Sequence, residues 1–484
     1  MSAPASRPVL PGGQSPVFVT GSTLRHVAVM TGTASVGLMA IFVVDFLSLL
    51  YVSRLGRPEA TAGVGFATII LFFAVSINIG LMIAASALCA RSIGAGDREG
   101  ARRVAGSTLA ISALAGLLIS LVALPFLPWV LRLLGAGGEA YSVALSFLWI
   151  ALPSNFLMAI GMVYSGVLRA VGDARRAMYV TLAGGIITAG LDPLLIFWLG
   201  LGPDGAAWAT VISRLCFALV GFHGAVRVHQ MVAMPTLIRI REDLNKVSAI
   251  AGPAIMTNLA TPVANAFFVS VIARFGDKAV AATAIIDRVV PVAFGILFAL
   301  SGAVGPILGQ NWGAGRFDRM RRALTDSAIF AALCVFSAWA VLVLFRNEIV
   351  QAFSATGLTA ELVVFFCLIS GPMWLFAGLL FVANAAFNNL GFPLWSTLFS
   401  WGRATLGTVP MAAIGAWIAG PKGALVGAAL GSVIFGIAAL VFAYRAIARL
   451  ERAAVAAASP DAYRTVQAAA GTVVQPDSNK TNAP

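Results

Sequence analysis

The chain has 484 residues, of which 60% are hydrophobic and only 11% are charged. A soluble globular domain carries roughly 25% charged residues, so this composition excludes a soluble protein and predicts an all-α integral membrane protein. The net charge of +13 would suit nucleic-acid binding, but the basic residues lie in short loops between apolar runs. That distribution is typical of a membrane protein, and we expect no nucleic-acid partner.

Twelve apolar runs are long enough to cross a bilayer, which needs roughly 20 residues. Turn residues such as Gly202-Pro203 and Gly420-Pro421 separate them. The runs lie at 26–52, 60–90, 104–131, 140–168, 177–200, 205–226, 247–273, 279–309, 323–345, 358–387, 393–419 and 423–447. If the N-terminus and the loops after even-numbered runs share one side, that side collects most of the Lys and Arg residues. It is therefore expected to be cytoplasmic, with both termini on it, in a multi-pass protein of the cell (inner) membrane.

Two copies of a short segment indicate that the chain has two related halves. Residues 92–103 read SIGAGDREGARR and residues 311–322 read NWGAGRFDRMRR, and each copy lies between two apolar runs. Six runs per half place both halves in the membrane with the same orientation, which predicts parallel repeats. We expect two pseudo-symmetric six-helix bundles around a central cleft. The expected parts are a cytoplasmic tail at 1–24, a first lobe at 25–226, a basic cytoplasmic linker at 227–246, a second lobe at 247–450 and a disordered cytoplasmic tail at 451–484.

The repeated GAG loops do not predict phosphate binding, because neither has a preceding strand or a Lys-Ser/Thr ending. We expect tight turns whose arginines contact phospholipid headgroups or clamp the bundle. The four cysteines all fall inside apolar runs, without the spacing of a disulfide framework or a metal motif. No cofactor and no resident metal is expected.

Carboxylates inside apolar runs are costly and are therefore candidates for function. Asp45 lies in the first run, Asp192 in the fifth and Asp287 in the eighth. The halves are asymmetric, since Asn265 stands at the position that corresponds to Asp45. Two carboxylates in one site repel each other, so binding H⁺ or Na⁺ between Asp45 and Asp192 would relieve that repulsion. Each acid could instead be a satisfied structural group.

Small polar residues accompany these acids. Thr188 lies one turn before Asp192 on the same face of its helix, and Thr210 follows in the next run. Their hydroxyls, with the two carboxylates, would suit a proton or a hard cation such as Na⁺ at Asp45, Asp192 and Thr210. Thr210 could equally bond back to its own helix. We hypothesise that four further residues, Asn155, Asn265, Asp287 and Arg288, form a wider polar network. The alternative is that they only join neighbouring helices.

Three segments resemble the multidrug and toxic compound extrusion (MATE) family. They are GPILGQNWGAGRFDRMRRAL at 305–324, VVDFLSLLYVSRLG at 43–56, and LDPLLI with GAAWAT in the fifth and sixth runs. The resemblance covers roughly residues 25–450 and is strongest to the prokaryotic DNA-damage-inducible branch. In that branch, it implies a cation site at the positions of Asp45, Asp192 and Thr210. Thr188 replaces an Asn that the branch often has.

The resemblance implies a secondary antiporter that exports amphiphilic, cationic small molecules in exchange for H⁺ or Na⁺ as two lobes rock. The protein is expected to act as a monomer, with a small-molecule substrate and membrane lipid as its partners. One alternative is a lipid-linked precursor flippase of the same superfamily, which would show extra spans or several cationic residues facing the cleft. A polytopic membrane enzyme is the other alternative, but His26, His223 and His229 are too scattered for a metal site.

Overall fold

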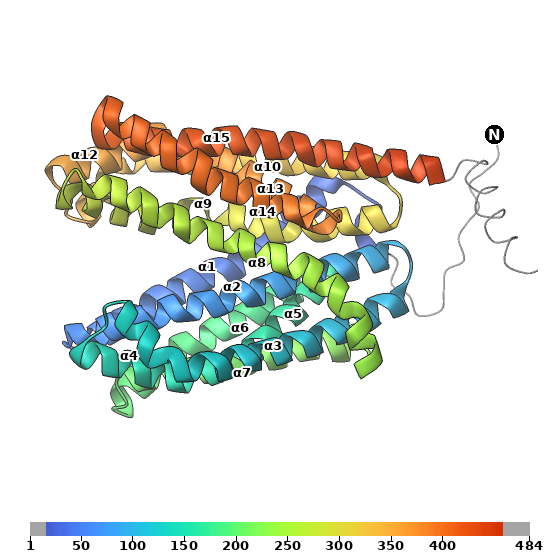
Figure 1. The fold of residues 1–484 in the computed structure, drawn as a ribbon, viewed down its shortest axis with the longest axis horizontal. Coiled ribbons are helices and arrows are strands. Elements are labelled where there is room, and N and C mark those ends of the chain that lie inside the picture. The colour runs from blue at the N-terminus through green and yellow to red at the C-terminus, as the bar shows by residue number, and fades with distance from the viewer. Residues whose placement is uncertain (1–15, 458–484) are drawn as a thin grey trace, which may run out of the picture.

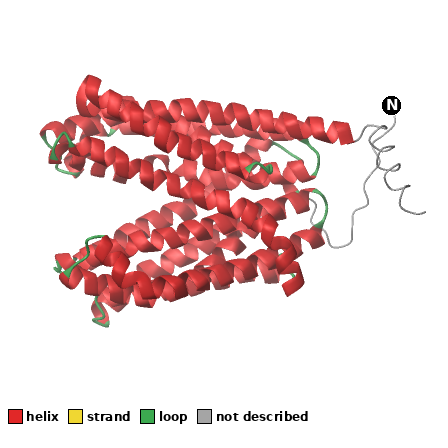
Figure 2. Ribbon diagram, in the orientation of Figure 1, coloured by secondary structure: helices red, strands yellow, loops and turns green. Residues whose placement is uncertain are grey.

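The computed structural model describes residues 16–457, and within this range the elements are all helices, joined by short loops, with no strand (Figure 2). The first half contains η1 (Val17–Val19), α1 (Thr23–Ser53), α2 (Pro58–Gly94), α3 (Arg98–Leu133), α4 (Gly138–Ala151), η2 (Leu152–Ser154), α5 (Asn155–Val171), α6 (Ala174–Pro193), η3 (Leu194–Trp198), α7 (Pro203–Phe222) and η4 (His223–Val228). The second half contains α8 (Leu237–Ala273), α9 (Asp277–Gly313), α10 (Phe317–Leu344), α11 (Arg346–Ala352), α12 (Gly357–Phe365), η5 (Phe366–Ser370), η6 (Gly371–Met373), α13 (Trp374–Asn389), α14 (Pro393–Gly402), η7 (Arg403–Thr408) and α15 (Val409–Ala457).

Eleven helical stretches of the described chain are long and apolar enough to cross a membrane. The last of them, Pro393–Ala456, is broken at Ala419 and Gly420, where Gly420 has φ +61° and so leaves the helical region. Pro421 follows and cannot donate a backbone hydrogen bond to the preceding turn. The stretch is therefore two spans joined by a tight turn, and the twelve predicted spans are present.

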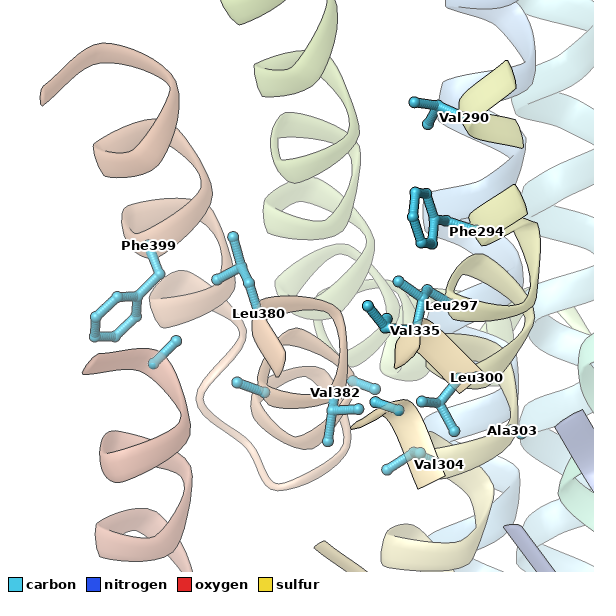
Figure 3. Packing of buried hydrophobic residues seen from close by; sticks show 14 of the residues in the cluster. Val290, Phe294, Leu297, Leu300, Ala303, Val304, Val335, Leu380, Val382 and Phe399 are labelled. Atoms are coloured by element: carbon cyan, nitrogen blue, oxygen red, sulfur yellow. The ribbon is translucent and has the colours of Figure 1, made fainter. Parts of the chain in front are cut away.

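The helices form two lobes, α1–α7 and α8–α15, which lie one above the other in Figure 1. The ribbons of the two lobes approach each other at the end that carries residues 94–97 and 313–316, and they diverge toward the opposite end. We call the first end the GAG end. Apolar side chains fill the second lobe, as Figure 3 shows for α9, α10 and α13. Within this core Phe294 stacks on Trp374 with ring centroids 5.6 Å apart.

Two boundaries differ from those expected. Helix α8 begins at Leu237, inside the segment expected to be a linker, because Thr236 caps its first turn by accepting from the Arg239 amide. The buried Asp243 then holds this turn to α3 through an ion pair with Arg103, at 3.0 Å. At the other boundary α15 continues to Ala457, past the start of the expected tail. Residues 1–15 and 458–484 of the two expected tails lie outside the described residues.

The two copies of the repeat meet at the GAG end. A Cβ atom on Gly94 would lie 2.0 Å from the backbone oxygen of Gln310, and one on Gly313 would lie 2.0 Å from that of Arg91. Both positions therefore require glycine, because the ends of α2 and α9 pack backbone against backbone. Arg91 also stacks over the Trp312 ring at 3.7 Å. The predicted tight turns are present, with Gly96 at φ +79° and Gly315 at φ +68°. Of the arginines that follow them, Arg103 forms an ion pair with Asp243 and Arg321 forms one with Glu451.

The segment before α1, which includes Phe18, packs against α9 and α10 near the GAG end. Phe18 is only 1% exposed, and its amide donates to Gln310 Oε1 at 2.9 Å. Gln310 is itself fully buried and donates through Nε2 to the Ala170 oxygen of the first lobe at 2.7 Å. Arg319 donates to the oxygens of Phe18, Thr20 and Gly21. Gln310 thus joins the first lobe, the second lobe and the N-terminal segment.

Candidate ion-coupling site

Helices α1 and α6 run parallel and bring Asp45 and Asp192 to the same region. Small residues allow the close approach, since a Cβ on Gly37 would overlap the Thr181 side chain and one on Gly185 would touch Val44. The same register, continued along both helices, places Ser48 opposite Asp192. The α-helix then ends at Pro193, and the chain continues in a π turn at Leu194–Trp198. Turns of this kind often occur at functional sites.

Asp192 is the buried member of the pair, with 1% of its surface exposed. Its Oδ2 accepts a short hydrogen bond from the Ser48 hydroxyl. Its Oδ1 is buried and has no hydrogen-bond partner among residues 16–457. A buried carboxylate with one donor for two oxygens is poorly satisfied when it is charged. A proton or a cation on Oδ1 would complete the group.

Asp45 has different surroundings, because it lies on the exposed side of α1. It is one helical turn before Ser48, on the same face of the helix. No hydrogen bond joins the Asp45 and Asp192 carboxylates in the described chain, but Ser48, one turn after Asp45, bonds to Asp192. The structure therefore brings the two acids together as neighbours, one of them open and the other enclosed.

The hydroxyls of the two threonines bond to their own helices. Thr188 Oγ1 donates to the Gly184 oxygen at 3.0 Å, and Thr210 Oγ1 donates to the Ala206 oxygen at 2.9 Å. The side chain of Thr210 extends from the face of α7 that packs on α6, since Ser213 on that face also donates to Gly184. Each threonine hydroxyl has used its proton and retains lone pairs that can accept a proton or bind a cation.

The wider network is not assembled by hydrogen bonds. Asn155 is buried in the first lobe, where its Oδ1 accepts from Asn78 at 2.9 Å. Asn265, Asp287 and Arg288 are exposed, and within residues 16–457 their side chains form no hydrogen bond and no ion pair. Asn155 thus joins helices, while the other three remain separate from it and from Asp192.

Two polar residues that support the region were not singled out from the sequence. Ser48 could have been found, because it is three residues after Asp45 and so lies on the same helical face. Arg214 of α7 is 7% exposed and donates to the Ala151 oxygen at 2.7 Å and to Ser154 Oγ at 3.0 Å. It thereby satisfies the break between α4 and α5, which Pro153 creates. Only the folded arrangement shows this role.

The oxygen ligands of the candidate site suit a hard cation or a proton and not a transition metal. No group of three or more His, Cys, Asp or Glu side chains that could hold a metal ion occurs in residues 16–457. Carboxylate and hydroxyl oxygens are the ligands of alkali and alkaline-earth cations.

Comparison with known proteins finds the same family match in each of the two lobes. The MatE family model matches residues 34–194 and 253–414, one match in each lobe. The chain belongs to the MATE family of transporters. It is a multi-pass membrane transporter and not an enzyme, and MATE transporters move small molecules without a cofactor.

Individual MATE relatives cover most of the chain. An FAD transporter of Shewanella oneidensis is 30% identical over 421 residues, which are 85% of this chain and 92% of that protein. The "Probable multidrug resistance protein YoeA" of Bacillus subtilis is 25% identical over 74% of this chain and 79% of its own length. An outward-facing structure of a multidrug resistance MATE transporter superposes with a TM-score of 0.85 at 24% identity, covering 91% of this chain and 99% of that one. A transporter from Pyrococcus furiosus gives 0.84 at 23% identity, over 91% and 99%. These structures share the two-lobe fold.

Proposed function

We propose that this transporter is a secondary antiporter that exports amphiphilic small molecules in exchange for H⁺ or Na⁺. The observation that carries the proposal is the buried Asp192 carboxylate, whose Oδ1 has no partner in the described chain although Ser48 holds Oδ2. Asp45, one turn from Ser48 on the exposed side of α1, provides the entry point for the ion. Thr188 and Thr210 supply further oxygen ligands at the same depth.

In this mechanism the ion must bind the two states of the lobes with different affinity, since equal binding would shift nothing. Neutralising Asp192 removes its repulsion with Asp45 and weakens its hydrogen bond with Ser48, because a charged acceptor binds a donor more strongly than a neutral one. Helix α1 is then free to move along α6, and the lobes rearrange. Moving one charge across the membrane supplies about 2.3 kcal/mol per 100 mV, which can sustain a substantial substrate gradient.

We further propose an orientation in the cell (inner) membrane with the GAG end and both termini in the cytoplasm. The basic loops 98–103, 169–176 and 316–322 support this orientation through the bias of Lys and Arg toward the cytoplasm. The protein would act as a monomer in contact with lipid, with one lobe formed by α1–α7 and the other by α8–α15. The cation positions resemble those of the DNA-damage-inducible branch.

Efflux of ethidium from proteoliposomes tests the site. We expect Asp192→Asn and Asp45→Asn to abolish efflux and the accompanying pH change, because neither amide can exchange a proton or neutralise a cation. Ser48→Ala should leave efflux slower but measurable. Asp277→Asn is the matched control, because Asp277 is exposed at the start of α9 in the second lobe, and this variant should transport as the unmodified protein does. Normal efflux by both site variants would exclude this site. Repeating the assay with and without Na⁺ identifies the ion.

Two substrate classes follow from different observations. Cationic amphiphiles are implied by the family resemblance and by the multidrug relatives. An anionic flavin nucleotide is favoured by the FAD transporter, which is similar over 85% of this chain. Lipid flipping, the remaining alternative, would appear as movement of labelled lipid between leaflets without release of a soluble compound.

A further inference from the structure

One arginine faces the opposite lobe without any partner. The side chain of Arg169, near the end of α5, forms no hydrogen bond and no ion pair with residues 16–457, and its Nε is buried and unsatisfied. A Cβ atom on Gly302 of α9 would lie 2.8 Å from Arg169 Nη1. Since α5 belongs to the first lobe and α9 to the second, the guanidinium lies in the seam between them.

The small cavity that this guanidinium lines contains no acidic side chain. It lines a cavity of about 10 Å³ together with Met30, Ala34, Met178, Thr181 and Ala303, which are all neutral. Such a cavity has room for about one water molecule. Asp173 is four residues away in sequence, but it is already held by His229 and Arg176. The charge of Arg169 is therefore uncompensated by any acid that lines its cavity.

Neither the repeated fold nor the bias of Lys and Arg toward the cytoplasm explains why position 169 is an arginine. In the second half the equivalent position is Asn388, which is buried and accepts a hydrogen bond from Ser396, so the repeat does not require a charge there. Arg214, which is buried within a span, donates to Ala151 and Ser154. Arg403 also has a buried and unsatisfied Nε, but its Nη2 donates to Thr261 Oγ1 at 3.4 Å. The bias of charges concerns loops that face the cytoplasm and not a side chain covered by the other lobe.

A second arginine of the seam lies nearer the GAG end. Arg91 has no acid partner in the described chain and stacks on Trp312. Trp312 is ten residues after Gly302 on α9, or about 15 Å along the helix. If the lobes separate at this end, the first surface uncovered is this arginine–tryptophan pair, and the second is Arg169.

We propose that Arg169 binds a phosphate group of an anionic amphiphile that enters the seam from the GAG end, with Arg91 and Trp312 forming the mouth of the path. A guanidinium offers a planar fork of donors that matches phosphate oxygens. The Trp312 ring, partly freed from Arg91, offers a face on which a planar ring can stack. This inference rests on the proposed function and deepens it by naming the substrate class.

The test compares two flavins that share one ring system. FAD carries a diphosphate, whereas riboflavin carries no phosphate, and both are fluorescent. Uptake into inside-out proteoliposomes under an imposed pH gradient is measured for the unmodified protein, Arg169→Gln and Arg169→Lys. We expect Arg169→Gln to lower the ratio of FAD to riboflavin uptake by about tenfold, the effect of losing one charge-assisted hydrogen bond. Arg169→Lys should restore part of the ratio, because lysine keeps the charge but not the planar fork, and this result also shows that the site tolerates substitution.

The outcomes separate this inference from the proposed function. If the unmodified protein exports ethidium but takes up no FAD, and no labelled phosphatidylglycerol changes leaflet, the antiporter stands and the anion site is overturned. An unchanged FAD to riboflavin ratio in Arg169→Gln overturns it as well. Movement of the labelled phospholipid that depends on Arg169, without FAD uptake, supports the phosphate site and assigns it to a lipid headgroup. Transport of none of these compounds would remove the proposed function itself.

Discussion

Gln310 provides the most direct test of how the seam is held closed. The change Gln310→Ala removes two hydrogen bonds, from Nε2 to the Ala170 oxygen at 2.7 Å and from the Phe18 amide to Oε1 at 2.9 Å. All of these groups are buried, so each bond removed leaves a backbone group unsatisfied at about 1–3 kcal/mol. Only the bond to the Ala170 oxygen crosses between the two lobes, so about 1–3 kcal/mol is lost from the closed seam. Since 1.4 kcal/mol corresponds to tenfold, the closed seam should lose population about tenfold or more relative to the open one.

A single cysteine in the seam reports this shift. Ala303 is 1% exposed and lines the cavity beside Arg169. In a background without the four native cysteines, Ala303→Cys should react slowly with a membrane-impermeant maleimide in inside-out vesicles. Adding Gln310→Ala should raise the labelling rate at least tenfold, because the lobes separate more often at the GAG end.

The control for this experiment removes a buried amide that lies within one lobe. Asn384 donates to Ser400 Oγ at 3.0 Å, and both residues belong to the second lobe. Asn384→Ala should therefore leave the labelling of Ala303→Cys unchanged. The reasoning is refuted if Gln310→Ala labels at the original rate, or if Asn384→Ala accelerates labelling to the same degree.

Three further predictions concern other contacts. Gly313→Ala should force the ends of α2 and α9 apart at Arg91, abolishing efflux and lowering stability by about 1–3 kcal/mol in a thermal unfolding assay of the purified protein. Arg214→Met should lower the unfolding temperature more than Arg214→Lys does, because only the lysine can still donate to the Ala151 oxygen. Burial raises the pKa of the Asp173 carboxyl, but hydrogen bonds from the Arg176 amide, His229 and the Arg176 side chain outweigh burial and hold that pKa below its usual range. The stabilisation by Asp173 is thus present above the ordinary carboxyl range and lost as pH falls, so Asp173→Asn should flatten the acid side of the stability profile.

The sequence predicted the architecture well because each span carries its own signal. Apolar runs separated by Gly and Pro marked twelve spans, including the break at Gly420, where positive φ is required. The GAG copies identified the two lobes, since a repeat is visible without knowledge of contacts. The start of α8 was missed because its first turns are basic and amphipathic, and they are held to α3 by the Arg103–Asp243 ion pair. A hydropathy pattern does not contain that contact.

The candidate site was only partly predictable for a similar reason. Asp45 and Asp192 stood out because charges are rare in apolar runs, and Ser48 follows from helical spacing. The unequal burial of the two acids could not be predicted from the sequence, because it depends on how α1 is rotated against α6. The bond between Phe18 and Gln310 joins residues 292 apart in sequence, and nothing local to either residue predicts it.

Helix α1 is fastened to a different lobe at each of its two ends. At its base the Thr23 hydroxyl donates to Asp326 of α10, in the second lobe, and near its outer half Ser48 donates to Asp192 of α6, in the first. Because α1 is bonded to both lobes, movement of one lobe relative to the other exerts a force along this helix. Protein engineers should therefore place tags and fusion partners at the C-terminus, because a load on the chain just before Thr23 would act on the same joint through which ion binding and lobe movement communicate.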